Sequence, residues 1–181
     1  YSFTDRGDRQ LSLKPEGTAG VIRSFIENKM YADTQPTKLY YITPCFRYER
    51  PQAGRQRQFH QFGIEVLGSD GPSVDAEVIS LAVQFFNEMG LKNLSVNINS
   101  VGCPTCREEY NRKLKEYLDK KVDVLCETCL ERKDKNPMRV IDCKNPHCKE
   151  NLQDIPFMID HLCEDCKDHF DKLQTYLKEM D

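Results

Sequence analysis

Two groups of residues in this sequence have side chains and spacings that suit chemistry. The first lies in FRYERPQAGRQRQFHQFGIEVLG, residues 46–68, where four arginines fall within eleven positions and a strand-like segment follows. The second is a set of eight cysteines beyond residue 100, arranged in four closely spaced pairs. Clustered arginines favour an anion-binding loop, and paired cysteines without a secretory signal favour metal ligands.

The arginine cluster comprises Arg47, Arg50, Arg55 and Arg57. A guanidinium group suits phosphate because its planar fork donates two hydrogen bonds and stays charged at physiological pH. A turn pattern at residues 51–54 divides the cluster, so a hairpin would carry Arg47 and Glu49 back beside the following strand. This arrangement favours a nucleotide triphosphate as ligand. The alternative is a solvated hairpin whose ion pairs contribute little stability.

The segment after the arginines alternates as a strand, and alternation divides its residues between two faces. Phe59, Gln61, Gly63 and Glu65 share one face, while the other is mostly apolar. Gln61 and Glu65 would lie about 13 Å apart, with a shallow trough over Gly63. We expect this face to hold a small polar ligand that the amide and the carboxylate orient. Phe59 would either stack on a flat ring or pack in the core.

Two stretches together resemble one enzyme family. Residues 46–68 resemble motif 2 of a class II aminoacyl-tRNA synthetase, in the version found in histidyl-tRNA synthetases. LKPEGTAG, residues 13–20, resembles the segment before that family's first core helix. The resemblance implies an α+β fold, with an antiparallel-sheet catalytic core and a helical insertion domain. It also implies that ATP activates histidine to histidyl-adenylate, with release of pyrophosphate, before the histidyl group passes to tRNA(His).

The resemblance further implies roles for individual residues. Arg47 would contact the α-phosphate, Glu49 the adenine amino group, Phe59 the adenine ring and Arg55 the terminal phosphate. The residues implied to bind histidine are Glu16, Gly17, Thr18, Gln61 and Glu65. Catalysis would then rest on positioning and electrostatic stabilisation, with Mg²⁺ sharing the charge of the phosphates.

The sequence begins at Tyr1 within a hairpin pattern, and we expect it to be a fragment of the bacterial type of enzyme. The family's first and third motifs and its second active-site arginine are missing from the sequence. We therefore expect this polypeptide to be inactive alone, and the full-length enzyme to be a cytoplasmic homodimer. The alternative function is a non-catalytic, synthetase-like regulatory subunit of ATP phosphoribosyltransferase. The intact PEGT segment and ATP-binding set argue against that alternative.

The cysteine pairs have the spacing Cys103-x2-Cys106-x19-Cys126-x2-Cys129-x13-Cys143-x4-Cys148-x14-Cys163-x2-Cys166. Two CxxC units separated by 19 residues match a four-thiolate zinc pattern. Eight cysteines would fill two structural zinc sites, although four pairs combine in three ways. Free thiols and disulfides are the alternatives. His147, His161 and His169 are either substitute ligands or ordinary surface and capping residues.

A zinc-ribbon module for nucleic acid would account for the cysteines but not for the first hundred residues. Residues 1–100 hold 11 basic and 11 acidic side chains, and residues 101–181 hold 15 and 18, for a formal net charge of −3. Any polyanion site is therefore a local arginine cluster. No apolar run approaches the roughly 20 residues of a membrane-spanning helix.

The hydrophobic pattern predicts the elements that must position these residues. Residues 1–100 form the predicted partial catalytic core, and residues 101–181 the predicted insertion domain, which the resemblance associates with the acceptor arm of the tRNA. In the core we predict a hairpin over 1–13, a helix capped by Thr18, strands over 38–43, 59–67 and 94–99, and a helix over 72–89 that Gly90 ends. In the insertion domain we predict helices through 110–118, 152–162 and 170–177.

Overall fold

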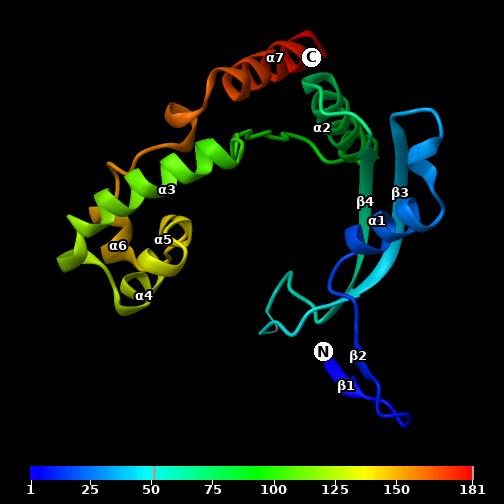
Figure 1. The fold of residues 1–181 in the computed structure, drawn as a ribbon, viewed down its shortest axis with the longest axis horizontal. Coiled ribbons are helices and arrows are strands. Elements are labelled where there is room, and N and C mark those ends of the chain that lie inside the picture. Colours follow the sequence, from blue (N-terminus) through cyan, green and yellow to red (C-terminus); the bar gives the residue numbers. More distant parts are fainter. Residues whose placement is uncertain (51, 181) are drawn as a thin grey trace. The chain divides into compact units, whose positions relative to one another are not determined.

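The computed structural model describes residues 1–50 and 52–180, so Pro51 of the predicted turn lies outside the described residues. Helices and antiparallel strands both occur, as expected for an α+β chain (Figure 1). Contacts between Cα atoms divide the chain into two compact units, Tyr1–Val78 and Ile79–Asp181. This division falls inside helix α2 (Pro72–Glu88) rather than near residue 101, where the sequence predicts a boundary.

The first unit opens with the predicted hairpin. Strands β1 (Ser2–Thr4) and β2 (Gln10–Ser12) pair antiparallel. The Asp5 carboxylate closes the turn because it accepts hydrogen bonds from the backbone N–H groups of Gly7, at 2.8 Å, and Arg9, at 3.0 Å. These bonds, with the Arg9 backbone bond the largest contribution, hold the pKa of Asp5 below its usual value.

Two longer strands form the second sheet, in which β3 (Thr37–Phe46) pairs antiparallel with β4 (Gln58–Leu67). The ladder sets Tyr41 opposite Gly63 and Thr43 opposite Gln61. Pairing continues past the strand ends, since the Arg47 N–H donates to the Arg57 carbonyl at 2.9 Å. Both predicted strands are present, and β3 extends further than the aromatic-rich run predicts.

Helix α1 (Thr18–Glu27) begins at Thr18, the residue predicted to cap it, because Gly17 rather than Thr18 is the N-cap. Gly17 has no side chain to accept a hydrogen bond. The Glu16 carboxylate takes that role, since it accepts the N–H groups of Thr18 at 2.8 Å and Ala19 at 3.0 Å. Thr18 does not cap the helix because its hydroxyl donates to Glu65. The short helix η1 (Met30–Ala32) follows.

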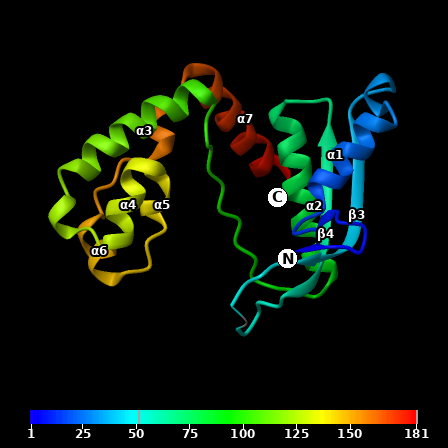
Figure 2. The same cartoon turned by 60° about the horizontal axis from the view of Figure 1, so that its bottom comes forward.

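The second unit is helical beyond residue 103. Its elements are α3 (Pro104–Asp119), η2 (Val122–Val124), α4 (Glu127–Lys135), α5 (Met138–Ile141), α6 (Pro146–Asn151), η3 (Met158–His161) and α7 (Glu164–Met180). Helices α4, α5 and α6 gather beside α3 (Figure 2). The core comprises side chains of α3, namely Tyr110, Leu114 and Leu118, with Val140 and several cysteines.

Two predicted elements of the second unit are wrong. Residues 94–99 do not form a strand, and Leu94 and Val96 are 39% and 51% exposed. A strand needs a partner for its backbone groups, and no described segment pairs with this one. Residues 152–162 contain only the η3 turn, because Pro156 lacks the N–H that a continuous helix requires.

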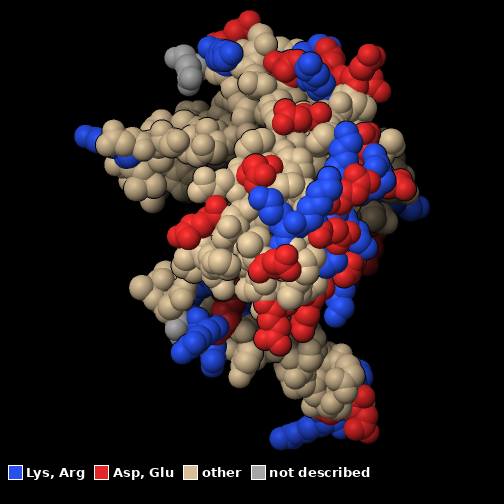
Figure 3. Space-filling model, turned by 90° about the vertical axis from the view of Figure 1, so that its left-hand side faces the viewer, with Lys and Arg blue, Asp and Glu red and all other residues tan. Residues whose placement is uncertain are grey.

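Charges of both signs are mixed on the surface of the second unit. Lys133 lies 2.6 Å from Asp119 and 3.4 Å from Asp134, and Lys115 lies 2.9 Å from Asp134. Figure 3 shows the same alternation of positive and negative side chains over one face. This pattern agrees with the prediction that any polyanion site is local. Within the described residues, each helix is too short or too polar to cross a bilayer.

Candidate functional site

The PEGT segment lies against the polar face of β4. The Gln61 side-chain oxygen accepts the Gly17 N–H at 3.2 Å, and the Thr18 hydroxyl donates to a Glu65 carboxylate oxygen at 2.6 Å. Glu16 is joined to this group through its bonds to the N-terminus of α1. The structure thus brings together all five residues that the resemblance associates with histidine, and Gln61 and Glu65 share a face as strand alternation predicts.

Tyr41 occupies the space that the sequence leaves as an open trough. A Cβ added to Gly63 would lie 2.1 Å from Tyr41 Cζ, and one added to Gly17 would lie 2.2 Å from Tyr41 Cε2. The Tyr41 hydroxyl is also 3.5 Å from the Thr18 hydroxyl. Sequence reasoning missed this residue, because Tyr41 lies opposite Gly63 only in the register that the two strands adopt. Tyr41 therefore forms the floor between the two glycines.

Replacing Gly63 by alanine is expected to lower the free energy of unfolding by about 1–3 kcal/mol, because the added methyl group overpacks against the Tyr41 ring. Urea denaturation of the chain measures this change. In a Tyr41→Ala background the same substitution should cost much less. The matched control is Gly20→Ala within α1, where a Cβ meets nothing within 4 Å. Equal unfolding free energies for Gly63→Ala and the unchanged chain would contradict this account.

The arginine loop forms a second, adjoining part of the site. The Arg47 Nε donates to the Pro15 carbonyl at 2.9 Å, and the Arg47 guanidinium lies 5.0 Å from the centre of the Phe59 ring. Arg55 and Glu49 form an ion pair at 3.4 Å. A cavity of about 530 Å³ is lined by these four side chains together with Gly54 and Gln56. Its volume is in the range of small-molecule sites.

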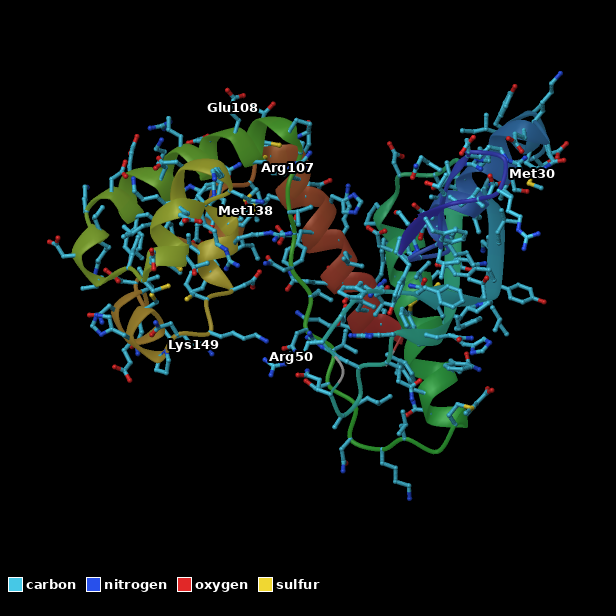
Figure 4. The ribbon with its side chains drawn as sticks, turned by 90° about the horizontal axis from the view of Figure 1, so that it is seen from below. Met30, Arg50, Arg107, Glu108, Met138 and Lys149 are labelled. Carbon is cyan, nitrogen blue, oxygen red and sulfur yellow. The ribbon has the colours of Figure 1, made fainter. Side chains whose placement is uncertain are left out.

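The four arginines of the cluster have different environments. Arg47 and Arg55 line the cavity. Arg57 has a structural role, since its guanidinium lies 4.8 Å from the centre of the Tyr48 ring and its Nε donates to the Glu49 carbonyl at 3.3 Å. Arg50, labelled in Figure 4, is exposed and is not part of the cavity lining. Sequence reasoning did not single out Gln56, which does line it.

The two parts of the site differ in charge. The Glu16 pKa is lowered, chiefly by the Ala19 backbone N–H and also by Thr18 and by the charge of Arg47, so this carboxylate is ionised at neutral pH. Glu16 and Glu65 therefore suit a ligand with ammonium or ring N–H groups. Arg47 and Arg55 suit phosphates. Together the parts could hold a cationic amino acid next to a polyphosphate, which is the arrangement that transfer to an α-phosphate requires.

The cysteines beyond residue 100 gather into two groups of four. One group is Cys103, Cys106, Cys163 and Cys166, and the other is Cys126, Cys129, Cys143 and Cys148. Within each group all the sulfur atoms lie within 4.8 Å of one another. All nine cysteines are free of disulfides. Cys45 is separate and buried, and its thiol donates to the Gln61 side-chain oxygen at 3.5 Å.

Local hydrogen bonds favour the thiolate at one cysteine of each group. The Cys106 backbone N–H, with the Cys106 side chain, lowers the pKa of Cys103 to about 6. The Cys129 backbone N–H is the main cause that lowers the pKa of Cys126 to about 7. Burial instead raises the pKa of Cys129. Thiolates are the metal-binding form of cysteine, so both groups have a ligand that is readily deprotonated.

Among the residues that the structure describes, none of the three candidate histidines belongs to either cysteine group. The His161 ring lies 5.9 Å from that of Tyr110, and its Nδ1 is 3.4 Å from Lys113 Nζ. The backbone N–H of His147 donates to the Asn145 side chain at the start of α6. His169 also makes an interaction of its own. The donor sets are therefore all sulfur.

Comparison with known proteins finds a match to the family model described as "Histidyl-tRNA synthetase" over residues 1–141. The chain is 78% identical over 180 residues to the histidine–tRNA ligase of Clostridioides difficile strain 630, covering 99% of the chain and 43% of that protein. It is 56% identical over 181 residues to the ligase of Clostridium perfringens strain SM101, covering 99% of the chain and 44% of that protein. The chain thus spans less than half the length of these relatives.

Two solved structures have a similar fold. The apo histidyl-tRNA synthetase of S. aureus matches with a TM-score of 0.75 and 39% identity, covering 99% of this chain and 42% of that one. A protein of Bacillus halodurans C, described as an ATP phosphoribosyltransferase regulatory subunit/histidyl-tRNA synthetase, matches with a TM-score of 0.60 and 21% identity. That match covers 99% of this chain and 50% of the other, and it bears on the fold alone.

Proposed function

Because this chain belongs to the histidyl-tRNA synthetase family, we propose that it supplies the part of a histidine–tRNA ligase that binds histidine and ATP. The observation that carries the proposal is the meeting of the PEGT segment with Gln61 and Glu65 beside an arginine-lined cavity. Neither part alone specifies the reaction. Together they offer adjoining sites for the two substrates of histidine activation.

In the proposed histidine site, Glu16, Thr18 and Gln61 hold the ammonium group, and Glu65 accepts a hydrogen bond from the imidazole ring. The Thr18–Glu65 bond of 2.6 Å supports this division, because it fixes one carboxylate oxygen and leaves the other for a ligand. Gly17 contributes by its small size, since a side chain there would meet the Tyr41 ring.

In the proposed ATP site, Glu49 accepts from the adenine amino group, Phe59 packs on the ring and Arg55 binds the terminal phosphate. The Arg55–Glu49 ion pair must then break when ATP binds. Arg55 would pair with the terminal phosphate instead of Glu49, and Glu49 would accept from the adenine amino group instead of pairing with Arg55. Such an exchange costs little because both side chains are partly exposed, at 54% and 38%.

Mg²⁺ is proposed to accompany ATP. It usually binds through one or two carboxylates and the phosphates of its substrate. Among the described residues that line the cavity, Glu49 alone has a carboxylate, so the phosphates would supply most of the ligands. When bound, the ion would share the negative charge of the phosphates with Arg47 and Arg55.

The proposed reaction needs no covalent intermediate on the enzyme. A carboxylate oxygen of histidine attacks the α-phosphorus, the bond to the bridging oxygen breaks, and pyrophosphate leaves with that bond's electron pair. Arg47 donates hydrogen bonds to the α-phosphate oxygens, where charge gathers in the transition state. A hydroxyl oxygen of the terminal ribose of tRNA(His) then attacks the histidyl carbonyl carbon, the bond from that carbon to the phosphate oxygen breaks, AMP leaves with its electron pair, and the hydroxyl proton is released.

The remaining assignments also belong to the proposal. We place the boundary between the partial catalytic core and the insertion domain near residue 101, and we assign contact with the tRNA to residues 101–181. The active enzyme is proposed to be a homodimer that works in the cytoplasm. The regulatory-subunit alternative has less support, because the structure that carries that description is 21% identical, whereas the ligase of C. difficile is 78% identical.

A chimera tests the proposed function. The chain replaces the matching segment of the C. difficile ligase, and histidine-dependent ATP–pyrophosphate exchange and histidylation of tRNA are measured. Since the two segments are 78% identical, we expect the chimera to retain both activities, and the isolated chain to show neither. A chimera that folds and forms its native oligomer but fails to activate histidine would refute the proposal. Exchange by the isolated chain would refute the expectation that it is inactive alone.

A further inference from the structure

We propose that the insertion domain binds two Zn²⁺ ions in two separate four-thiolate sites with nested pairing. The outer site comprises Cys103, Cys106, Cys163 and Cys166, and the inner site comprises Cys126, Cys129, Cys143 and Cys148. Of the three ways to combine four cysteine pairs, the geometry selects the one that joins the first pair to the fourth and the second to the third. This inference is independent of the proposed catalytic function.

The sulfur–sulfur distances fit a shared ion. Cys103 and Cys106 have their sulfur atoms 3.5 Å apart, and those of Cys126 and Cys143 are 3.8 Å apart. A tetrahedral ion with bonds of about 2.3 Å to sulfur sets its ligands about 3.8 Å apart. A disulfide would require about 2.05 Å. The side chains therefore point to common centres without being bonded to one another.

Backbone groups around the sulfurs would stabilise thiolates. The Cys163 N–H lies 3.1 Å from the Cys106 sulfur, and the Cys126 N–H lies 3.1 Å from the Cys148 sulfur. Each of these bonds crosses between the two pairs of one site, so it supports the same pairing as the sulfur positions do. Cys103 and Cys126 are also the N-caps of α3 and α4, where the helix dipole favours negative charge.

Side chains pack closely around the cysteines of both groups. Gly102, beside the outer site, has a φ of +62°, and a Cβ there would lie 2.6 Å from Cys106 Cβ. In the inner site Cys129 and Cys148 are fully buried, and Cys143 is 7% exposed. In the inner site cysteines thus occupy core positions where large apolar side chains are common, and a bound metal would stabilise this part of the fold.

The donor set favours zinc over iron–sulfur clusters. Four cysteine sulfurs suit either. In a cluster the thiolates bind different iron atoms and so lie farther apart than around one ion, whereas each set here fits within 4.8 Å. A mononuclear tetrahedral site with only sulfur ligands is the arrangement of structural zinc.

The nesting gives the two sites different structural roles. The outer site ties the start of α3 to the start of α7, across a separation of 57 residues between Cys106 and Cys163. Closing a longer loop removes more conformational entropy from the unfolded chain, so this site is expected to stabilise the fold more than the inner site does. The inner site ties α4 to Cys148 on α6. The outer ion would therefore define where the insertion domain begins and ends, and the inner ion would hold its middle.

Metal analysis of the chain, purified without chelator, is expected to find two zinc ions per molecule. Cys103→Ser/Cys163→Ser removes two ligands of the outer site and should retain one zinc. Cys103→Ser/Cys126→Ser damages both sites and should retain none. Cys45→Ser is the matched control and should retain two, because Cys45 belongs to neither group. Iron in place of zinc, or no zinc in a folded Cys103→Ser/Cys163→Ser variant, which both other pairings predict, would overturn the proposal.

A measurement on the unchanged chain decides the pairing even if the variants fail to fold. After substitution with ¹¹³Cd, a proton–cadmium correlation spectrum should show two cadmium signals, each coupled to the β-protons of four cysteines. One signal should correlate with the outer set and the other with the inner set. A single signal, a histidine coupling, or a signal that mixes the two sets would contradict the proposal.

Discussion

Substitution of Arg47 by alanine in the chimeric ligase is expected to lower histidine-dependent ATP–pyrophosphate exchange by about 10²–10³-fold, the effect of removing one preorganised donor from a developing negative charge. The loss should appear mainly in kcat, because the guanidinium is proposed to act on the transition state more than on bound ATP. Steady-state exchange kinetics at varied ATP and histidine concentrations measure both constants.

The position of Arg47 explains the size of this effect. Its Nε is held by the Pro15 carbonyl and its guanidinium is held against Phe59, so the remaining N–H groups are directed before substrate arrives. Pro15 lies next to Glu16, which the resemblance associates with histidine. One side chain thus contacts both the segment proposed to bind the amino acid and the cavity proposed to bind the nucleotide. The reacting atoms of the two substrates must meet at such a junction.

A further variant separates the guanidinium's geometry from its charge. Arg47→Lys keeps the charge but loses the planar fork, and we expect an intermediate loss. Arg9→Ala is the control, since Arg9 is 78% exposed in the β1–β2 turn and its ion pair with Asp5 contributes little stability. It should alter exchange less than about twofold. An Arg47→Ala enzyme as active as this control would show that Arg47 has no part in catalysis.

The polar face of the site was predictable because strand alternation is a local property. Gln61, Gly63 and Glu65 share a face whatever β4 packs against. Tyr41 was missed because its place over Gly63 depends on the register between two strands, which neither strand specifies alone. The cap of α1 was misassigned for a similar reason, since Glu65, 47 residues away, takes the Thr18 hydroxyl.

For the cysteines too, the local sequence predicts the kind of site but not which residues come together in the folded domain. Their spacing predicts the kind of site, because two thiolates of a CxxC unit reach one ion from a single turn. Which pairs meet depends on where the helices end. Pro156 interrupts the helix that the apolar spacing predicts through 152–162, and the chain after it brings Cys163 to Cys106. The positions where helices end, and the packing of the helices on one another, therefore decide which cysteine pairs meet, and the period of the apolar residues does not.

Glu65→Gln in the chimeric ligase is expected to raise the KM for histidine by about 10- to 100-fold, because a hydrogen bond to a charged group contributes about 1.5–3 kcal/mol. Glutamine has the same shape and keeps one acceptor oxygen for Thr18, so the substitution removes the charge and replaces the second acceptor oxygen by an amide donor. The KM for ATP should stay within about twofold, since Glu65 does not line the nucleotide cavity. The control is Glu77→Gln on α2, a partly exposed residue paired with Lys38.

A structural role for Glu65 would give a different pattern. If the carboxylate served only to hold the PEGT segment through Thr18, then Glu65→Gln, which keeps an acceptor for the Thr18 hydroxyl, would leave the KM for histidine nearly unchanged, and only Glu65→Ala would lower the free energy of unfolding. If Glu65 binds the imidazole, Glu65→Gln should leave the unfolding free energy within about 1 kcal/mol of the parent, because one neutral hydrogen bond remains. It should also reduce discrimination against amino acids without a ring N–H, since rejection of such ligands depends on the acceptor that they leave unpaired.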